Sequence, residues 1–565
     1  MGIDITVKIG GEAGQGIQTV GDVLAEVCRN AGFYSMAISD FESRIRGGHS
    51  FFQIRISDAP ILAPASTVHL LVSLDGKTYN LYKNQLAEGG LVIVENEEVD
   101  DDRVLQLPIK NLANEAGGKV MANTVAAGAI LSLLGAPFAL FEDLLVKRFS
   151  AKSQEVVDNN IKAARLGADA VSDVEFQWAF KWENGSPKGV LINGAKAISL
   201  GALAGDCRFG AFYPMSPATS IMANLVSYTD DFPLVIEQVE DEIAAVNAVI
   251  GASYAGVRAM TSTSGGGFSL MVEGLGLAGI AEIPIVIVNA QRPGPATGLP
   301  TRTGQADLLF TIRASQDEFP RFVFAPSTPE DAYNITARAF HLAEKYQVPA
   351  LVLTDQYLND SLYIVEKPFT APEKIERFIV TDDEISSPAD YKRYALTESG
   401  ISPRALPCKG KALVLSSGNE HTEDGHISED QVNRVKMVDK RNAKLPAMTA
   451  EIQPPEGYFA DADTLLVGWG STKGAIREAV DMLKAKGLNV GCLTFTEVWP
   501  FPVDVVTPIL EKVKRFLVVE QNSTAQFGSL IREQTGLKYS QAILKYDGRP
   551  LYPSEIVDQF NKKTE

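Results

Sequence analysis

The chain has 565 residues, which is enough for three or four domains that each bury a core. Its 45% hydrophobic and 22% charged residues are ordinary for a soluble globular protein. The formal net charge of −18 argues against nucleic acid as a ligand, because phosphate binding needs a basic surface.

The four cysteines are scattered and form no C-x-x-C pair; they are Cys28, Cys207, Cys408 and Cys492. By themselves they cannot hold an Fe–S cluster or a structural zinc, which usually need four ligands with close pairs. They do not indicate a disulfide framework either, so a reducing cytoplasm fits best.

The first residues, M-G-I-D-I-T-V, lack the basic and apolar regions of a signal peptide. The most apolar long stretch, residues 265–290, contains Glu273 and Glu282 and is broken by Pro284. We therefore expect this stretch to be buried core rather than a membrane span.

Residues 1–180 predict an α/β domain with a parallel sheet. A strand at 3–9 leads through the glycine turn G-G-E-A-G-Q-G at 10–16 into an amphipathic helix at 17–31. Later strands are expected at 34–38, 51–56, 69–73 and 91–94, and a helix at 123–134.

The glycine turn departs from the G-x-G-x-x-G spacing of dinucleotide-binding folds, because Ala13 stands where the second glycine is needed. Asp40 could act as the ribose-binding acid, so the turn gives a weak indication of NAD binding. The segment S-R-I-R-G-G-H at 43–49 supplies cations and flexible backbone. It is consistent with a phosphate-bearing ligand or a subunit contact.

Residues 188–367 predict a second doubly wound α/β domain. Its expected strands lie at 234–236, 259–262, 285–289, 322–324 and 350–354, and its helices at 194–204, 241–255, 268–280 and 329–346. Polar, glycine-rich turns follow these strands. In an open α/β sheet such turns line the crevice at the carboxyl ends of the strands, where ligands bind.

Glu242 follows one of these strands and lies in the first turn of the next helix. First-turn carboxylates commonly complement the helix dipole, which is the ordinary interpretation. The alternative is a partly desolvated acid that faces a cofactor ring.

The run S-G-G-G at 264–267 lies between a predicted strand and helix. A tight turn needs one glycine, whereas three glycines allow backbone to approach a ligand and leave helix N–H groups open. Tyr213–Ser220 carries three small hydroxyls, of Ser216, Thr219 and Ser220, before another helix. Capping explains one hydroxyl, and carboxylate binding would explain the others.

Arg292 and Arg302 bracket a turn of proline and glycine. Arginines are usually surface residues, but a guanidinium held in such a loop suits bidentate recognition of a carboxylate.

Residues 368–460 are richer in Ser, Pro, Glu and Asp and predict an extended connecting segment. Within it, H-T-E-D-G-H-I-S-E-D at 421–430 has residue types that can bind metal, although such loops are usually just solvated. Residues 461–565 predict a compact α/β domain, with strands at 464–469, 490–493 and 515–519.

Taken together, these motifs identify a family resemblance that covers nearly the whole chain. The chain resembles the fused γ/α subunit of 2-oxoacid:ferredoxin oxidoreductases, and most closely the 2-oxoglutarate:ferredoxin oxidoreductase α type. The motifs are G-G-E-A-G-Q-G-I (10–17) with R-G-G (46–48), Y-P-M-S-P-A-T (213–219), E-D-E-I-A-A (240–245), T-S-G-G-G-F-S-L-M (263–271), Q-R-P-G-P-A-T-G-L-P-T (291–301) and E-H-T-E-D-G-H (420–426).

The resemblance implies an α/β fold with a γ-type domain at 1–180, associated with CoA, and a thiamine diphosphate pyrimidine-binding domain at 188–367. A connecting segment at 368–460 and a transketolase C-terminal-like domain at 461–565 follow. It implies that 2-oxoglutarate, CoA and oxidised ferredoxin give succinyl-CoA, CO2 and reduced ferredoxin, or that the reverse reaction fixes CO2.

The resemblance also implies residue roles. Glu242 corresponds to the glutamate that hydrogen-bonds the aminopyrimidine of the cofactor, which is the catalytic contact. Ser264, Gly265, Gly266 and Phe268 would contact thiamine diphosphate. Substrate contacts would come from Tyr213, Ser216, Thr219, Arg292 and Arg302, although the family usually has Thr where this chain has Ser216. Contacts to CoA or a subunit would come from Gly11, Gly14, Gly16, Arg44 and Arg46.

The chain has no G-D-G followed by Asn-Asn to bind the diphosphate through Mg²⁺, and no cysteine cluster. In the resembling family both belong to a β subunit, which carries Mg²⁺ and a 4Fe–4S cluster. We therefore expect an (αβ)₂ heterotetramer that reduces ferredoxin, with no activity of this chain alone and no metal site of its own.

Three alternatives stay open. The first is the same chemistry on pyruvate, branched-chain or diverse 2-oxoacids. The second is a non-catalytic structural subunit whose ligand sites are vestigial. The third is an NAD-binding dehydrogenase built on the first domain.

Overall fold

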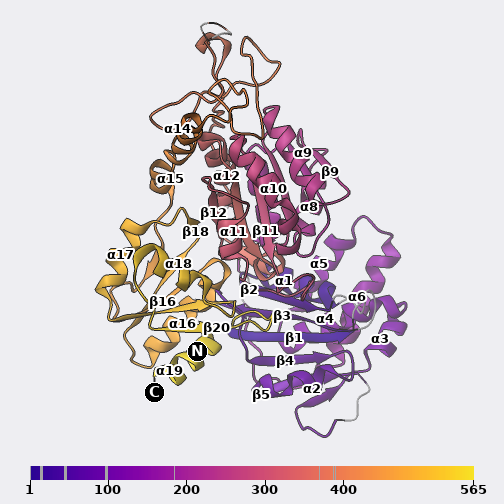
Figure 1. The fold of residues 1–565 in the computed structure, drawn as a ribbon. Helices are drawn as coiled ribbons and strands as arrows, with labels where there is room; N and C mark the ends of the chain where they lie inside the picture. Colours follow the sequence, from indigo (N-terminus) through magenta and orange to yellow (C-terminus); the bar gives the residue numbers. More distant parts are fainter. Residues whose placement is uncertain are drawn as a thin grey trace. The chain divides into compact units, whose positions relative to one another are not determined.

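The computed structural model describes residues 2–12, 17–42, 48–95, 99–182, 185–367, 369–385, 387 and 390–564 (Figure 1). These residues form two compact units. The first comprises Met1–Ile192, Asp360–Pro368 and Tyr552–Ser554, and the second comprises Asn193–Asn359, Phe369–Leu551 and Glu555–Glu565.

The first unit is built on an eight-stranded sheet in the order β6-β5-β4-β1-β3-β2-β14-β7. Its strands are β1 (Asp4–Glu12), β2 (Tyr34–Phe41), β3 (His49–Ser57), β4 (Val68–Ser73), β5 (Leu86–Val94), β6 (Val104–Gln106), β7 (Val190–Asn193) and β14 (Leu362–Val365). Its helices are α1 (Ile17–Asn30), α2 (Thr78–Tyr82), α3 (Ile109–Ala116), α4 (Ala122–Leu133), α5 (Phe138–Phe149) and α6 (Gln154–Asp169), with short 3₁₀ turns η1 (Lys83–Gln85) and η2 (Lys119–Met121).

The sheet of the first unit corrects the expectation of parallel strands. From β6 to β1 the strands are parallel, but β3 is antiparallel to both β1 and β2, and β2 is antiparallel to β14. The physical reason is the short connection between β2 and β3. A connection of a few residues can join only antiparallel neighbours, because a parallel pair needs a long crossover.

The second unit contains a seven-stranded sheet in the order β18-β12-β13-β11-β10-β8-β9. All neighbours are parallel except β18, which runs antiparallel to β12. The strands are β8 (Phe209–Phe212), β9 (Val235–Gln238), β10 (Ala259–Thr263), β11 (Val286–Gln291), β12 (Phe322–Phe324), β13 (Ala350–Asp355) and β18 (Glu497–Trp499). The central strands β10, β11 and β13 are fully buried, as expected for a parallel sheet covered on both faces.

The helices of this sheet are α7 (Gly194–Ala204), α8 (Thr219–Val226), α9 (Glu242–Tyr254), α10 (Gly265–Ile280), α11 (Leu308–Arg313), α12 (Pro329–Tyr346) and α13 (Gln356–Asp360). From β8 the chain moves outward to β9 and then returns past β8 to β10. Right-handed crossovers therefore place α8 on one face and α9 and α10 on the other. The contacts agree, because α7 packs against α8 and α12. Helix α9 packs against α10 (Figure 1).

A five-stranded sheet in the order β15-β17-β16-β19-β20 completes the second unit. Its strands are β15 (Glu456–Tyr458), β16 (Thr464–Trp469), β17 (Val490–Phe495), β19 (Arg515–Glu520) and β20 (Gln541–Leu544); its helices are α16 (Lys473–Ala485), α17 (Val503–Lys512), α18 (Gln526–Thr535) and α19 (Pro553–Thr564), with η4 (Gly470–Thr472). One hydrophobic cluster joins this sheet to the seven-stranded sheet. Gln305 also bridges them, because its Nε2 donates to Trp469 O at 2.9 Å and its Oε1 accepts from Gln521 N at 3.1 Å.

The segment expected to be extended contains helices α14 (Gln431–Asn442) and α15 (Leu445–Glu451) and the 3₁₀ turn η3 (Asp382–Glu384). The sequence pattern hides α14 because its buried side chains are Met437, Lys440 and Arg441. A helix that buries two cations shows little of the apolar period by which helices are recognised.

Two buried carboxylates of the seven-stranded part hold this segment. Glu282 accepts from Lys440 and from Lys444, the latter at 2.6 Å, and all three side chains are buried. Burial opposes ionisation of Glu282, but the two ammonium groups outweigh it and keep the pKa of this carboxyl well below its usual range.

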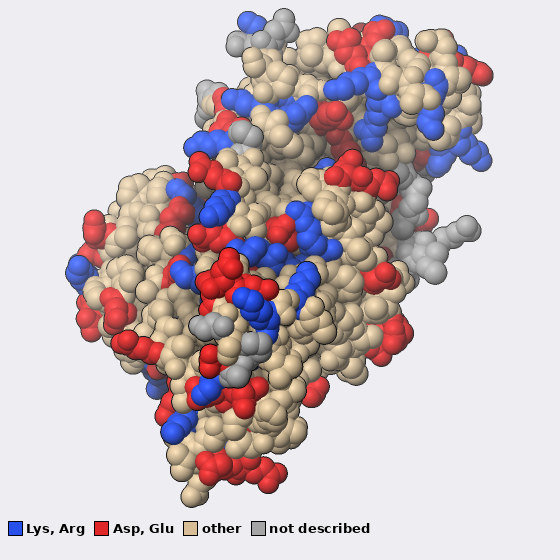
Figure 2. All heavy atoms as spheres, turned by 90° about the horizontal axis from the view of Figure 1, so that it is seen from above, with Lys and Arg blue, Asp and Glu red and all other residues tan. Residues whose placement is uncertain are grey.

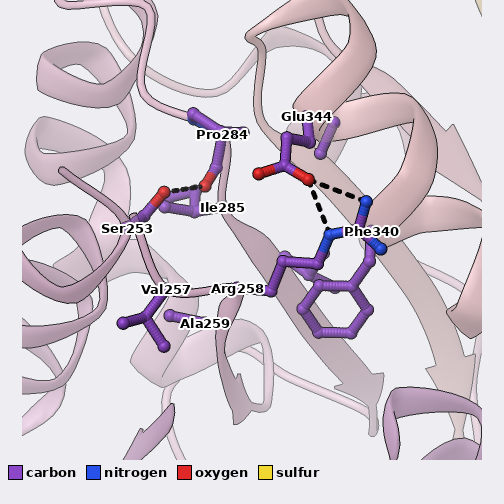
Figure 3. Close-up of a pocket in the computed structure, with 10 residues that line it drawn as sticks. Ser253, Val257, Arg258, Ala259, Pro284, Ile285, Phe340 and Glu344 are labelled. Carbon is purple, nitrogen blue, oxygen red and sulfur yellow. Dashed lines mark hydrogen bonds and ion pairs between the residues drawn. The ribbon is translucent and has the colours of Figure 1, made fainter. Parts of the chain in front are cut away.

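Glu344 of α12 is the second buried carboxylate. Arg258 donates to its Oε2 at 2.7 Å, and these two side chains face one another in Figure 3. From the segment, Arg377 and Arg404 reach its Oε1 at 2.9 and 3.1 Å. The segment is therefore docked by paired charges rather than left as a solvated connection.

Figure 2 shows a face on which Lys and Arg side chains are interspersed with Asp and Glu side chains, so this face offers no continuous basic patch. All four cysteines are unpaired, and Cys408 alone among them is exposed. Within the described ranges, no helix is long and apolar enough to cross a membrane.

Candidate active site

The candidate site lies at the carboxyl ends of β8, β10 and β11. The connections after β8 and β10 leave in opposite directions, because the chain reverses its course across the sheet between these neighbours. Such a reversal opens a crevice beside the strand ends, and this is where open α/β sheets bind ligands. The turns that follow these strands carry most of the residues singled out from the sequence.

Glu242 is the first residue of α9, but it does not cap the helix. The side chain of Asp241 does so, accepting from Ala244 N at 2.8 Å. Glu242 is only 3% exposed, and its Oε1 is buried without a hydrogen-bond partner among the described residues. A carboxylate that served only the helix dipole would remain solvated, whereas an orphaned buried oxygen indicates a missing donor.

Helix α10 begins at Gly265, three residues earlier than the sequence predicts, so the glycines form its first turn. A Cβ on Gly267 would overlap Thr263 Oγ1 and Glu242 Oε1, while a Cβ on Gly265 would overlap Asp307 Oδ2. The glycines are therefore required by close side chains and not by the backbone geometry of a turn. Between them Gly266 is open, since the nearest atom to a Cβ there would be Ala296 O at 3.7 Å.

The other two residues of this motif differ in their surroundings. Ser264 precedes the helix with an extended backbone, and its buried hydroxyl has no hydrogen-bond partner within the described part of the chain. Phe268 lies in the hydrophobic core, fully buried and edge-on to Phe310 at 5.2 Å between ring centroids. Ser264 thus offers a polar group to a ligand, whereas the Phe268 ring packs in the core beneath the first turn of α10 and stabilises it.

The turn after β8 presents Tyr213 and Ser216 to solvent, and Thr219 begins α8. The peptide between Ser216 and Pro217 is cis. Ser216 O accepts from Arg292 Nη1 at 2.6 Å, which joins this turn to the loop after β11. The structure therefore brings Arg292 and the hydroxyl-bearing turn together, as a carboxylate site would require.

Arg302 occupies a different place in the same long loop. Arg302 is only 9% exposed. Its loop is tied to the bend at residues 547–549, because Thr303 N donates to Gly548 O at 3.3 Å. The side chain packs close to Gly548. Burial makes Arg302 an integral part of the loop rather than a surface arginine.

Asp307 is a residue of this site that the sequence reasoning did not single out. Its position before α11 resembles that of a helix cap, yet its side chain makes no capping hydrogen bond. Instead Oδ2 accepts from Asn289 Nδ2 at 3.3 Å and lies against Gly265. Burial raises the pKa of Asp307 to about 6, while the bond from Asn289 and the charge of Arg292 act in the opposite direction. An acid directly before an apolar helix is such a common cap that sequence gave no other signal.

Of the candidates in the first unit, Gly11 pairs with Ser50 in the sheet, and Ser50 Oγ donates to Gly11 O at 3.3 Å. Gly14, Gly16, Arg44 and Arg46 lie outside the described residues. Asp40 is a buried residue at the end of β2.

The E-H-T-E-D-G-H motif takes part in packing. Glu420 accepts from Arg434 and Arg441 at 2.6 and 2.8 Å. His421 is buried, with its ring centroid 3.9 Å from that of Tyr394. In the described part of the chain, no group of three or more His, Cys, Asp or Glu side chains could hold a metal ion.

Three stretches of the chain match known protein families. Residues 200–440 match the family described as "Pyruvate flavodoxin/ferredoxin oxidoreductase, thiamine diP-bdg". Residues 6–170 match "Pyruvate ferredoxin/flavodoxin oxidoreductase", and residues 462–556 match "Pyruvate:ferredoxin oxidoreductase core domain II".

Individual proteins are similar over most or all of the chain. A 2-oxoacid:ferredoxin oxidoreductase α subunit from Aeropyrum pernix is 30% identical over 98% of this chain and 97% of its own. A 2-oxoglutarate synthase subunit KorA from Methanothermobacter marburgensis is 31% identical over 65% of this chain and 97% of its own. The solved 2-oxoglutarate:ferredoxin oxidoreductase from Magnetococcus marinus, with 2-oxoglutarate, coenzyme A and succinyl-CoA bound, superimposes with a TM-score of 0.92, 31% identity and complete coverage of both chains.

Proposed function

Because this chain belongs to the family of 2-oxoacid:ferredoxin oxidoreductase α subunits, we propose that its substrate is 2-oxoglutarate. The reaction converts 2-oxoglutarate, CoA and two oxidised ferredoxins to succinyl-CoA, CO2, two reduced ferredoxins and a proton, or runs in reverse. The similarity to the Magnetococcus marinus enzyme supports this choice of substrate over the others of the class.

The observation that carries the proposal is the orphaned Oε1 of Glu242 beside a glycine turn. The cofactor that fits is thiamine diphosphate, because its aminopyrimidine offers a nitrogen to a buried carboxyl and its ring needs the open space over Gly266. The cofactor supplies the carbon nucleophile and electron sink that decarboxylation of a 2-oxoacid requires. Glu242 would exchange a proton with that nitrogen through Oε1, and Ser264 with the N–H groups of Gly265 and Gly266 would offer further hydrogen bonds to the cofactor.

The substrate contacts come from the turn after β8 and the loop after β11. Arg292, fixed by Ser216 O, binds the carboxylate next to the keto group. Tyr213, Ser216 and Thr219 line the same side with hydroxyl groups. Arg302 is assigned to the distal carboxylate of the dianionic substrate.

The chain provides one half of a site. We assign the diphosphate end of the cofactor, Mg²⁺ and the 4Fe–4S cluster to a β subunit in an (αβ)₂ heterotetramer that passes electrons to ferredoxin. Residues 1–180 form the γ-type domain that takes part in CoA binding through Gly11, Gly14, Gly16, Arg44 and Arg46. Residues 188–367 form the pyrimidine-binding domain, residues 368–460 the connecting segment and residues 461–565 the transketolase C-terminal-like domain. Unpaired cysteines support a cytoplasmic location.

The test is to coexpress the chain with its β subunit and to measure acyl-CoA formation from 2-oxoglutarate and from pyruvate. Succinyl-CoA formation with the higher kcat/KM is the expected result. Faster formation of acetyl-CoA would replace 2-oxoglutarate by pyruvate as the substrate. That second candidate has an observation in its favour, because the Aeropyrum pernix relative carries the broad name 2-oxoacid. Binding of NAD by the first unit would instead support a dehydrogenase.

A further inference from the structure

Asp307 is a buried carboxyl whose side chain makes few interactions that stabilise the fold. Its side chain does not cap α11, and the hydrogen bond from Asn289 Nδ2 is a long one of 3.3 Å. Among the described residues no carboxylate–cation pair within 4.0 Å includes it. Buried carboxyls without strong partners are costly, so such a group is retained for another reason.

The carboxyl of Asp307 lies at the centre of the proposed site. Oδ2 lies against Gly265 at the first turn of α10, and Glu242 Oε1 lies against Gly267 of the same turn. The two acids thus flank the open position at Gly266. Arg292 is the cation whose charge acts on Asp307; its guanidinium is held by Ser216 O, and among the described residues no hydrogen bond or ion pair within 4.0 Å joins it to the acid.

We propose that Asp307 sets the effective charge of Arg292 and thereby the affinity for the anionic 2-oxoacid, an inference that rests on the proposed function. When ionised, Asp307 offsets the guanidinium and repels the incoming substrate carboxylate. When protonated, it leaves the full charge of Arg292 to the substrate. Asp307 is a positioning residue in this scheme, because it acts on the substrate through the field at Arg292.

Both protonation states have a partner at this position. Asn289 Nδ2 donates to the ionised carboxylate, while Asn289 Oδ1 is buried and has no hydrogen-bond partner in the described ranges. A protonated Asp307 can donate to that oxygen once the amide turns. Burial already raises the pKa of Asp307 to about 6, close enough to neutrality for both forms to occur during turnover.

The surrounding charges are few. Arg292 acts on Asp307 from the loop after β11, and Glu242 lies at the far end of the α10 turn. From α18, the neutral Gln526 reaches both sides of Asp307, because its Oε1 accepts from Leu309 N of α11 at 3.0 Å and its Nε2 donates to Ala306 O at 2.7 Å. Asp355, opposite Gln291 in the sheet, is also buried, and burial raises its pKa to about 6. Asp355 is therefore the group that a test must separate from Asp307.

The experiment measures KM and kcat for 2-oxoglutarate against pH in the assembled enzyme carrying Asp307→Asn, with Glu273→Gln as a matched control. Glu273 is an exposed carboxylate of the same helix α10. In the wild type, KM rises about tenfold as the pH passes through the Asp307 pKa, because a negative charge then opposes the guanidinium that binds the substrate. In the Asp307→Asn enzyme, KM stays at its low-pH value across the pH range, and kcat differs from that of the wild type by less than KM does. The Glu273→Gln enzyme shows the same rise of KM as the wild type.

Asp307→Ala removes the same charge and serves as the second variant if the asparagine enzyme does not assemble. A wild-type rise of KM that persists in both variants overturns the inference, as does a rise that disappears only in Asp355→Asn. A wild-type enzyme without activity on any 2-oxoacid counts against the proposed function instead.

Discussion

At the residue scale, the surroundings of Glu242 decide between its two interpretations. Its position in the first turn of α9 could be read from the sequence, and so could the alternatives of dipole partner and cofactor contact. Only the structure decides between these interpretations, because it shows that Asp241 caps the helix and that Glu242 Oε1 is buried against Gly267. A buried oxygen of this kind is stabilised when a ligand supplies the missing hydrogen bond.

Glu242→Gln should therefore lower kcat of the assembled enzyme by about 10²–10⁴-fold, because an amide cannot exchange a proton with the cofactor nitrogen. Glu240→Gln, which changes an exposed carboxylate two residues earlier, should leave kcat unchanged. Steady-state ferredoxin reduction measures both. Turnover of the Glu242→Gln enzyme at the wild-type rate would support a structural subunit with vestigial sites.

At the element scale, the first turn of α10 shows what a motif alone cannot reveal. Three glycines were visible in the sequence, but they were interpreted as a turn before the helix. The structure shows that Gly265 and Gly267 are needed because acids and Thr263 approach their Cα atoms. Glu242 at the start of α9 and Asp307 before α11 are distant from these glycines in sequence, so local propensity does not reveal their approach.

Gly267→Ala should destabilise the fold by about 1–3 kcal/mol and displace Glu242, because the new methyl group overlaps both Thr263 and Glu242. Gly251→Ala is the matched control. Gly251 lies in α9 with no atom within 4 Å of the added Cβ, so this change should raise stability by up to about 1 kcal/mol through helix propensity. Thermal unfolding of both variants gives the comparison. Equal melting temperatures would contradict the close packing described for the α10 turn.

Helices α14 and α15 also escaped sequence analysis, since the residues that α14 buries include cations. Their docking depends on Glu282, which lies between Lys440 and Lys444. Glu282→Gln should cost about 3–5 kcal/mol of unfolding free energy, because it leaves two buried ammonium groups without a counter-charge. Asp439→Asn, an exposed change on α14, should cost almost nothing. Urea unfolding measures both losses. A loss for Glu282→Gln as small as that of the control would show that the contacts of Glu282 with the two lysines are not essential.

The contacts of Glu282 with the two lysines also predict how stability depends on pH. The pKa of Glu282 is lower in the folded chain than its ordinary value of 4.5, so the stabilisation is complete above that value. As the pH falls below about 4.5, the unfolded chain takes up this proton first, and stability declines. The wild type should therefore lose more stability than Glu282→Gln between neutral pH and pH 4 or below. Parallel losses in the two proteins would exclude Glu282 as a source of the acid sensitivity.

At the scale of the whole molecule, the α/β class and most strands of both parallel regions could be predicted from the sequence. Strand β12, strand β16 and helix α12 have the bounds that the pattern indicated. The pairing of β14 with β2 and that of β18 with β12 could not be predicted, because each joins segments far apart in the chain. The candidate site was predictable in its motifs, while Asp307 appeared only once its missing cap bond was seen.

We propose that this chain supplies one part of a thiamine-diphosphate-dependent active site and that a β subunit supplies the rest. The direct measurement is 2-oxoglutarate- and CoA-dependent ferredoxin reduction by the purified chain alone and by the chain copurified with its β subunit. We expect no activity from the chain alone, and activity from a complex that contains iron, labile sulfide and thiamine diphosphate. A colourless, active homo-oligomer of this chain, or a complete complex inactive with every 2-oxoacid, would contradict the claim.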